Sequence, residues 1–171
     1  DGLFISVAAG NAFESYNSAG LSYPAVSSHV VPVASHDANG QISDFSQRAS
    51  NVLVAPGESI KSTVPDHLFG NLQHNKFLGS TGTSMAAPYV AGASAILRQA
   101  NEAMGVTGIN QDLLYKQFRD TADRIFDSVT SGYYYKINLE AALSSVTSNR
   151  VAAGIDSPSD TAVSLKSGRL T

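Results

Sequence analysis

No cysteine occurs among the 171 residues of this sequence. Disulfide bonds, thiolate metal sites and cysteine nucleophiles are therefore excluded, although this absence points to no particular compartment. Charge is also sparse: 15% of the residues are charged, the formal net charge is −3, and the basic residues form no stripe. Nucleic acid is therefore not expected as a partner. Apolar runs of membrane-spanning length are missing too, so the sequence predicts no membrane partner.

Internal repeats, metal-ligand spacings of the His-Glu-x-x-His kind and a signal peptide are likewise missing from the sequence. The first residue is Asp1, and residues 3–9 already have the apolar character of a strand. We therefore expect the chain to be the later part of a longer protein. Its hydrophobic fraction of 43% is that of a globular protein, and its length suffices for one domain with a sizeable core.

Three short segments have the pattern of buried strands. The continuous apolar run at residues 3–9 is typical of a strand buried on both faces of a parallel sheet. Residues 29–35 and 52–56 are further strands, although Pro32 removes a backbone donor from the first of them. We expect Pro32 to lie where its N–H would have had no strand partner. Residues 59–64 and 76–80 have the length and polarity of a hairpin.

Two helices are expected in the later part of the chain, each after an asparagine that suits an N-cap. Asn110 precedes a helix to about residue 122, and Asn138 precedes a helix over residues 139–146. The apolar residues expected to face the core are Leu114, Phe118 and Ala122 in the first, and Leu139, Ala142, Leu143 and Val146 in the second. Residues 12–21 have the polar composition of a surface loop.

One segment carries the chemistry. Residues 82–92 are Gly-Thr-Ser-Met-Ala-Ala-Pro-Tyr-Val-Ala-Gly, and an alanine-rich helical pattern continues to residue 100. Apolar positions nearly surround this helix, so we expect it to be buried. Thr83 suits an N-cap, and Pro88 lacks the N–H that the carbonyl of Ser84 would otherwise accept. Ser84 therefore stands at a helix N-terminus, which favours the negative charge that develops in acyl transfer.

A serine at such a place is more often a cap than a nucleophile. The sequence around it decides between the two, because Gly-Thr-Ser-Met-Ala-Ala-Pro followed by Val-Ala-Gly closely resembles the nucleophile motif of the subtilisin-like serine peptidases, the subtilases. The motif differs from the Gly-x-Ser-x-Gly elbow of α/β-hydrolases. By this resemblance Ser84 is the expected nucleophile and Thr83 an expected support of the oxyanion.

Two further matches follow in the order that the family has. The apolar run that ends in Gly10-Asn11 resembles the subtilase strand that delivers the oxyanion-hole asparagine, so Asn11 is the expected donor to the oxyanion. Alone, this dipeptide would indicate only a turn. Tyr23-Pro24 stands where the family has a Tyr-Pro at the base of its specificity pocket, and the resemblance allows a cis peptide bond there.

The resemblance also predicts the pocket for the substrate side chain just before the scissile bond. Its expected residues are Ala9, Gly10, Ala12, Ser22, Tyr23 and Pro24. Ala12 replaces a residue that subtilisins often have as polar or acidic, and Ser22 stands where many members have glycine. We therefore expect a neutral pocket that is shallower than the broad subtilisin pocket.

The general base of the triad is not evident in this sequence. In subtilases the order is Asp, then His, then Ser, and the Asp-Ser/Thr-Gly and His-Gly-Thr contexts of the first two do not occur here. The four histidines are His29, His36, His67 and His74. We expect His67 and His74 to be solvated residues of the hairpin loop, and His36 with Asp37 to form a turn.

The resemblance implies an α/β fold: a mainly parallel sheet with flanking helices, in which residues 1–146 are the C-terminal half of a subtilisin-like catalytic domain. Residues 147–171 are expected to be a poorly ordered tail or linker. Residues 133–135, all tyrosine, resemble the turn before the last helix of the family. No cofactor is expected, but family analogy allows a weakly bound structural calcium on carbonyls near residues 25–30. Secretion is expected from the resemblance alone.

Serine endopeptidase is the implied activity, with protein or peptide substrates and an acyl-enzyme on Ser84. Because the Asp and His of the triad are expected upstream, the N-terminal half of the same domain is the expected partner, and the chain alone is expected to be inactive. The alternative from another class is a non-catalytic half-domain, or a degenerate peptidase domain that acts in binding. An esterase of another fold is disfavoured, because the motif is not the hydrolase elbow.

Overall fold

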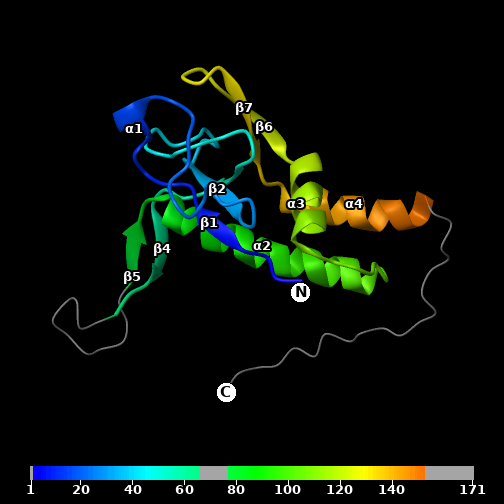
Figure 1. Ribbon diagram of the computed structural model, residues 1–171. Coiled ribbons are helices and arrows are strands. Elements are labelled where there is room, and N and C mark those ends of the chain that lie inside the picture. Colours follow the sequence, from blue (N-terminus) through cyan, green and yellow to red (C-terminus); the bar gives the residue numbers. More distant parts are fainter. Residues whose placement is uncertain (1, 66–76, 153–171) are drawn as a thin grey trace.

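The computed structural model describes residues 2–65 and 77–152 (Figure 1). The predicted loop histidines, His67 and His74, and residues 153–171 of the predicted tail lie outside the described residues. In chain order the elements are β1 (Ser6–Ala8), α1 (Phe13–Tyr16), β2 (Val31–His36), β3 (Leu53–Pro56), β4 (Ile60–Thr63), β5 (Phe77–Ser80), α2 (Thr83–Ala103), α3 (Gln111–Asp120), β6 (Asp123–Asp127), β7 (Gly132–Lys136) and α4 (Leu139–Ala152).

The central sheet has the strand order β1-β2-β3-β7-β6. Its first four strands are parallel, and β6 joins β7 as an antiparallel edge. The helices α2, α3 and α4 lie together on one side of the sheet, whereas the hairpin β4–β5 projects from the body (Figure 1). The predicted α/β fold, with a mainly parallel sheet and flanking helices, is confirmed, as is the predicted hairpin.

Two apolar clusters fill the faces of the sheet. On the face with the helices, the buried side chains are Val31, Val33, Leu53, Ala55, Ala86, Ala87, Val90, Ala93, Leu97, Leu114, Phe118, Ala142 and Val146. The other face is covered mostly by loops and by the end of the sheet at β6 and β7, with Ala9, Ala34, Ile42, Val52, Val54, Ile125 and Tyr134 buried. None of the described helices combines the length and hydrophobicity needed to cross a bilayer.

Pro32 lies in β2 without costing the sheet a hydrogen bond. The N–H of Val31 donates to the carbonyl of Ile5 at 2.8 Å, on the side of β1. The N–H groups of successive residues in a strand point to opposite sides, so the backbone nitrogen of Pro32 points toward β3. The register between β2 and β3 begins one residue later, at Val33. The expectation that Pro32 lies where its N–H would have had no strand partner is therefore confirmed.

The predicted N-caps of the last two helices are confirmed as well. Asn110 Oδ1 accepts the N–H of Leu113 at 2.9 Å, and Asn138 Oδ1 accepts the N–H of Ala141 at 3.0 Å. Each bond satisfies a donor that the first turn of a helix leaves unpaired.

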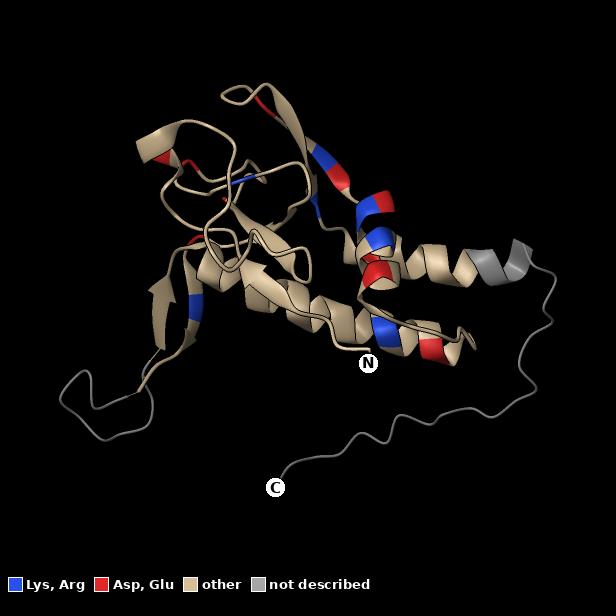
Figure 2. Cartoon of the chain, in the orientation of Figure 1, with Lys and Arg blue, Asp and Glu red and all other residues tan. Residues whose placement is uncertain are grey.

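Helix α2 is buried on one side only, which corrects the expectation that it is buried nearly all round. Val90 and Leu97 have no exposed surface, whereas Tyr89 is 54% and Ile96 is 48% exposed. The helix carries no charged residue before Arg98, while charged residues gather on α3 and the adjoining strand (Figure 2). The outer side of α2 therefore presents apolar surface that no described residue covers.

Strand β1 is shorter and less buried than predicted. It comprises Ser6–Ala8 rather than residues 3–9, and Leu3 is 73% exposed. The reason is its position, because β1 is an edge strand among the described residues and pairs only with β2. An edge strand has one side without a neighbour and leaves N–H and C=O groups unpaired.

The C-terminal part corrects three expectations. Residues 133–135 lie in β7 and not in a turn, since β7 pairs with both β3 and β6. Helix α3 ends at Asp120, so Ala122 lies beyond it. Helix α4 ends at Ala152, six residues beyond the predicted end at Val146. No glycine or proline occurs before Gly154, and adding residues to a formed helix costs little free energy.

The N-terminal part brings one further correction. The short helix α1 lies within residues 12–21, which were predicted to be a surface loop.

A buried ion pair joins the loop after β2 to the hairpin β6–β7. Arg48 Nη1 lies 2.9 Å from Asp127 Oδ2, and the two side chains are only 2% and 6% exposed. The other guanidinium nitrogens donate to the carbonyls of Ser46, Ser43 and Asp44. The guanidinium also stacks over the ring of Phe13 at 3.7 Å. These contacts fix residues 43–48 against the sheet.

This pair is expected to make the fold sensitive to acid. Burial raises the pKa of Asp127, but hydrogen bonds from Thr130 and Arg48 outweigh burial and hold the pKa below its ordinary value. The pair's contribution to stability is therefore complete above the unfolded pKa of about 3.9 and is lost as the pH falls through the lower folded pKa. Urea unfolding from about pH 7 to pH 2 is expected to show this loss, and Asp127→Asn is expected to reduce it. Equal acid sensitivity in the two proteins would contradict the assignment.

Candidate active site

The predicted site residues meet at the carboxyl ends of the parallel strands. Asn11 follows β1, and Thr83 opens α2, 72 positions later. The N–H of Gly82 donates to the carbonyl of Gly57, just after β3, at 2.8 Å. This bond holds the N-terminus of α2 at the edge of the sheet where open α/β folds bind their ligands.

Thr83 orients the side chain of Asn11. Asn11 Oδ1 accepts the backbone N–H of Thr83 at 2.9 Å and its hydroxyl at 2.9 Å. The same hydroxyl oxygen accepts the N–H of Gly10 at 3.2 Å. Because Oδ1 is held twice, the amide nitrogen Nδ2 is the part of this exposed side chain that remains available to a ligand.

Gly82, and not Thr83, is the N-cap of α2. Its φ of 151° lies in a region that glycine tolerates, and a Cβ there would come within 3.1 Å of Asn11 Nδ2. A side chain at this position would therefore strain the backbone and crowd the amide. The hydroxyl of Thr83, which was expected to cap the helix, bonds to Asn11 instead.

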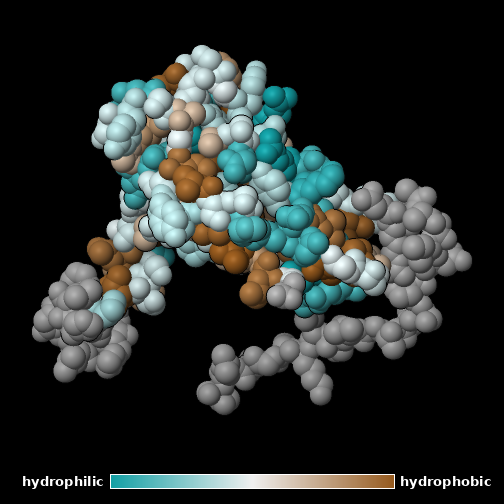
Figure 3. Space-filling view, in the orientation of Figure 1, coloured by the Kyte–Doolittle hydropathy of each residue, from teal (hydrophilic) through white to brown (hydrophobic). Residues whose placement is uncertain are grey.

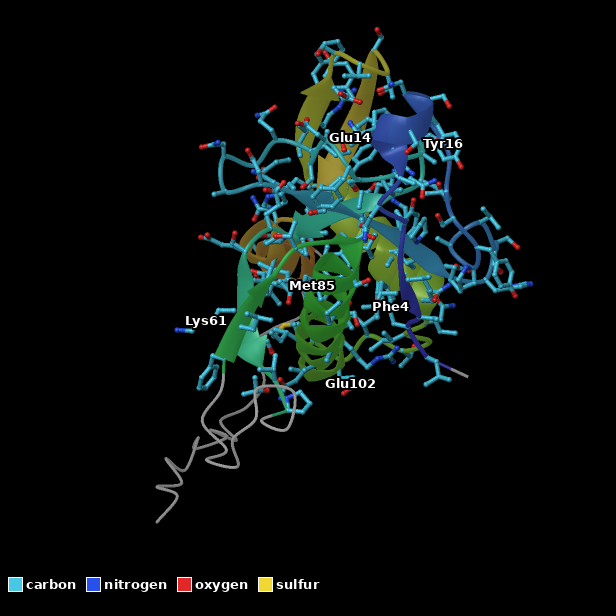
Figure 4. All side chains as sticks on the ribbon, turned by 90° about the vertical axis from the view of Figure 1, so that its left-hand side faces the viewer. Phe4, Glu14, Tyr16, Lys61, Met85 and Glu102 are labelled. Carbon is cyan, nitrogen blue, oxygen red and sulfur yellow. The ribbon has the colours of Figure 1, made fainter. Side chains whose placement is uncertain are left out.

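Ser84 is exposed at the second position of α2, in the first turn, where N–H groups have no partner within the helix. It opens onto a groove of about 290 Å³ between the start of α2 and the hairpin β4–β5. The residues that line this groove are Ile60, Ser62, Thr63, Val64, Leu78, Ser80, Ser84, Met85 and Pro88. Met85 lies in the first turn of α2 beside the hairpin, whereas Lys61 points from the hairpin to solvent (Figure 4).

No histidine in the described part of the chain is hydrogen-bonded to Ser84. His36 Nδ1 lies 2.7 Å from the carbonyl oxygen of Asp37, and the Asp37 carboxylate accepts the N–H groups of Asn39 and Gln41. The bond from Gln41 is the main reason that the pKa of Asp37 lies below its ordinary value. Asp37 therefore caps the predicted turn, directly after His36, which is the last residue of β2.

Three of the predicted pocket residues come together beside Asn11. The N–H of Ser22 donates to the carbonyl of Ala9 at 2.9 Å, which brings Ser22 against Ala9 and Gly10. The Tyr23–Pro24 peptide bond is cis, as the resemblance allowed. Tyr23 is 86% exposed, and Ala12, the N-cap residue of α1, is exposed as well.

Gln47 is a neighbour of the site that the sequence did not reveal. Its N–H donates to the carbonyl of Gly10 at 2.8 Å, and its Oε1 accepts the Ser22 hydroxyl at 2.5 Å. It lies on the loop after β2, in a segment with no catalytic motif of its own. The buried residues on either side of it, Ser46 and Arg48, show that this segment is structurally constrained.

Side-chain clusters that could hold a metal ion are absent from residues 2–65 and 77–152: no three His, Asp or Glu residues converge there. The calcium expected on carbonyls near residues 25–30 is a different kind of site and stays a prediction.

Comparison with known proteins identifies the class. The structure is similar to that of the prenylagaramide maturation protease PagA, with a TM-score of 0.69 and 22% identity over 84% of this chain and 50% of that one. It is also similar to the patellamide maturation protease PatA, with a TM-score of 0.65 and 25% identity over 82% of this chain and 50% of that one. The fold is thus that of the subtilisin-like proteases.

Sequence similarity places the chain more closely. It is 33% identical to subtilisin DY of Bacillus licheniformis over 82% of this chain and 47% of that protein. It is 39% identical to the major intracellular serine protease of Bacillus subtilis (strain 168) over 60% of this chain and 30% of that protein. The sequence model of the subtilase family, peptidase family S8, matches residues 1–131. The chain belongs to the subtilase family, and it spans less than half the length of these two relatives.

Proposed function

We propose that this chain is the C-terminal half of the catalytic domain of a serine endopeptidase whose nucleophile is Ser84. Ser84 Oγ attacks the carbonyl carbon of the scissile peptide bond while its proton passes to a general base. The carbonyl oxygen becomes an oxyanion that accepts hydrogen bonds from Asn11 Nδ2 and from the backbone N–H of Ser84. Collapse of this intermediate releases the protonated amine, and water then hydrolyses the acyl-enzyme.

The observation that carries the proposal is the hydrogen bonding between Thr83 and Asn11. Two bonds of 2.9 Å hold the oxygen of the Asn11 amide, and the helix that supplies both begins one residue before Ser84. A fixed neutral donor beside an exposed hydroxyl is the arrangement that acyl transfer requires, because a preorganised donor needs no rearrangement when charge develops. Thr83 therefore supports the oxyanion by positioning Asn11.

The general base and its carboxylate are proposed to come from the N-terminal half of the same domain. The surface supports such a partner: hydrophobic residues extend along α2 and the hairpin β4–β5 (Figure 3). Tyr89 and Ile96 of α2 and Phe77 and Leu78 of the hairpin are 47–58% exposed. A second protein surface would remove these side chains from water, which favours association.

The second candidate function is a non-catalytic half-domain that acts in binding. The same uncovered side of α2 and the unpaired edge of β1 favour it, since both are available to a partner in the chain alone. A domain that only binds has no need of a free donor at Asn11, so the geometry at the helix N-terminus favours the peptidase.

A fluorophosphonate probe, followed by peptide mapping, tests the choice. We expect the probe to label Ser84 in the full-length parent and not in this chain alone, because the triad is completed only in the parent. Labelling of the isolated chain would mean that one of its own histidines activates Ser84. Absence of labelling in both would refute the peptidase and leave the binding function.

The compartment is a separate matter. Secretion was expected from the resemblance, but one relative is named as an intracellular serine protease. Secretion therefore stays a prediction, which fractionation of the source cells would test.

A further inference from the structure

The position of the proposed nucleophile determines where the adjoining substrate side chain lies. This step rests on the proposed function, in which Asn11 Nδ2 and the N–H of Ser84 hold the scissile carbonyl. The side chain of the residue that owns this carbonyl begins two bonds from the carbonyl carbon, so it lies near the residues that flank Asn11. Gly10 is the flanking residue on the side of β1, and the groups packed on Gly10 bear on which side chain fits.

Ser22 and Gln47 fill the space beside Gly10. Gly10 has a φ of +115°, and a Cβ at this position would lie 1.9 Å from Gln47 Oε1 and 2.3 Å from Ser22 Oγ. The glycine is therefore required by the close approach of two polar side chains as well as by its backbone angle. These side chains shorten any pocket that opens beside Gly10.

The loop around Gln47 is held firmly. The N–H of Gln47 bonds to Gly10, and its neighbours Ser46 and Arg48 are 0% and 2% exposed. All three guanidinium nitrogens of Arg48 are engaged with Asp127 and with backbone carbonyls. Arg48 therefore turns its charge away from Gly10, and the groups that face Gly10 are neutral.

The hydrogen bond between the two side chains leaves donors free. Ser22 Oγ donates to Gln47 Oε1, so the two N–H groups of Gln47 Nε2 are not needed for this contact. Among the described residues, none accepts a hydrogen bond from Nε2. The Ser22 oxygen in turn retains lone pairs. Together the pair offers both a donor and an acceptor, which is the complement of a carboxamide.

We propose that Gln47 is a specificity-determining residue: with Ser22 it forms the floor of the pocket beside Gly10 and selects a short, uncharged substrate side chain that accepts a hydrogen bond, with asparagine fitting best. Leucine has nearly the shape of asparagine but leaves the floor N–H groups unpaired. Phenylalanine is too long for the shortened pocket, and lysine finds no counter-charge.

The test measures kcat/KM of the full-length parent for peptides that differ only in the residue before the scissile bond. Gln47→Met keeps the length of the side chain but removes its N–H groups, and we expect it to lower the preference for Asn over Leu by about tenfold. Gln47→Ala opens space, and we expect it to raise the rate for Phe relative to Asn. Gln41→Met is the matched control, since Gln41 is exposed and its side chain bonds to nothing in the described part of the chain.

Labelling of Ser84 by the fluorophosphonate probe gives the concentration of active sites in each variant, so partial misfolding does not disturb the ratios. An unchanged preference in Gln47→Met, with Ser84 still labelled, would overturn the assignment of Gln47 while leaving the peptidase intact. Parent protein that is neither labelled nor active would instead refute the proposed function, and the pocket with it. Gln47→Glu provides a further check, because a carboxylate keeps the length of the side chain but donates no hydrogen bond, so this variant is also expected to lower the preference for Asn over Leu.

Discussion

Replacement of Ser84 by alanine in the full-length parent is expected to abolish peptidase activity. The substitution removes the oxygen that forms the acyl-enzyme in the proposed mechanism, while Asn11 and the helix N-terminus stay in place. In subtilisin, loss of the nucleophile costs about 10⁶ in kcat, and we take this magnitude from that relative rather than derive it. Hydrolysis of a peptide substrate, followed over several days to measure very slow turnover, gives the ratio of rates.

Ser94→Ala is the matched control for this experiment. Ser94 lies on the same helix, is 6% exposed, and donates its hydroxyl to the carbonyl of Ala91 within the helix at 2.7 Å. The change of atoms is identical, but it falls far from the groove at the N-terminus of α2. We expect its kcat to stay close to that of the wild type. Unchanged turnover in Ser84→Ala would refute Ser84 as the nucleophile.

Replacement of Asp127 by alanine is expected to cost about 3–5 kcal/mol of the free energy of unfolding. The substitution leaves the guanidinium of Arg48 buried without its counter-charge, in a side chain that is 2% exposed. Whole domains are stable by only about 5–15 kcal/mol, so this single change would remove a large part of the total. Urea unfolding of the wild type and the variant at neutral pH measures the difference.

The ion pair between Lys116 and Asp120 offers a control of the same chemistry on the surface. Its side chains are 72% and 57% exposed, so water screens the charges and Asp120→Ala is expected to change stability by less than about 1 kcal/mol. A double variant, Arg48→Met with Asp127→Leu, removes both buried charges and is expected to recover much of the loss. A small effect of Asp127→Ala would show that water enters and solvates Arg48.

The sequence predicted those parts of the structure that depend on neighbours along the chain. The caps at Asn110 and Asn138 follow from the preference of asparagine at helix starts, and the hairpin β4–β5 follows from its length and polarity. The site residues Asn11 and Ser84 came from motifs, and the fold brings them to the same edge of the sheet. Their catalytic roles remain predictions until the probe or the variants are tested.

What the sequence could not predict depends on partners far apart in the chain. Arg48 and Asp127 are 79 positions apart, and no sequence pattern near either residue predicts that they pair. Gln47 acquires its place only because the chain brings it against Gly10 and Ser22. The exposure of α2 was missed for a related reason, because an apolar helix surface predicts contact but does not reveal whether the contacting segment is present.

The order of the strands also sets the order in which the nascent chain can fold. β3 finds β2 soon after it is made, but its other neighbour, β7, comes only after α2 and α3. Closing so long a loop is entropically costly, which makes this pairing a late and slow event. Until β7 has left the ribosome, one side of β3 stays open, and until Asp127 of β6 has been made, Arg48 has no counter-ion. This is the stage of synthesis at which we expect the chain to be most prone to aggregate.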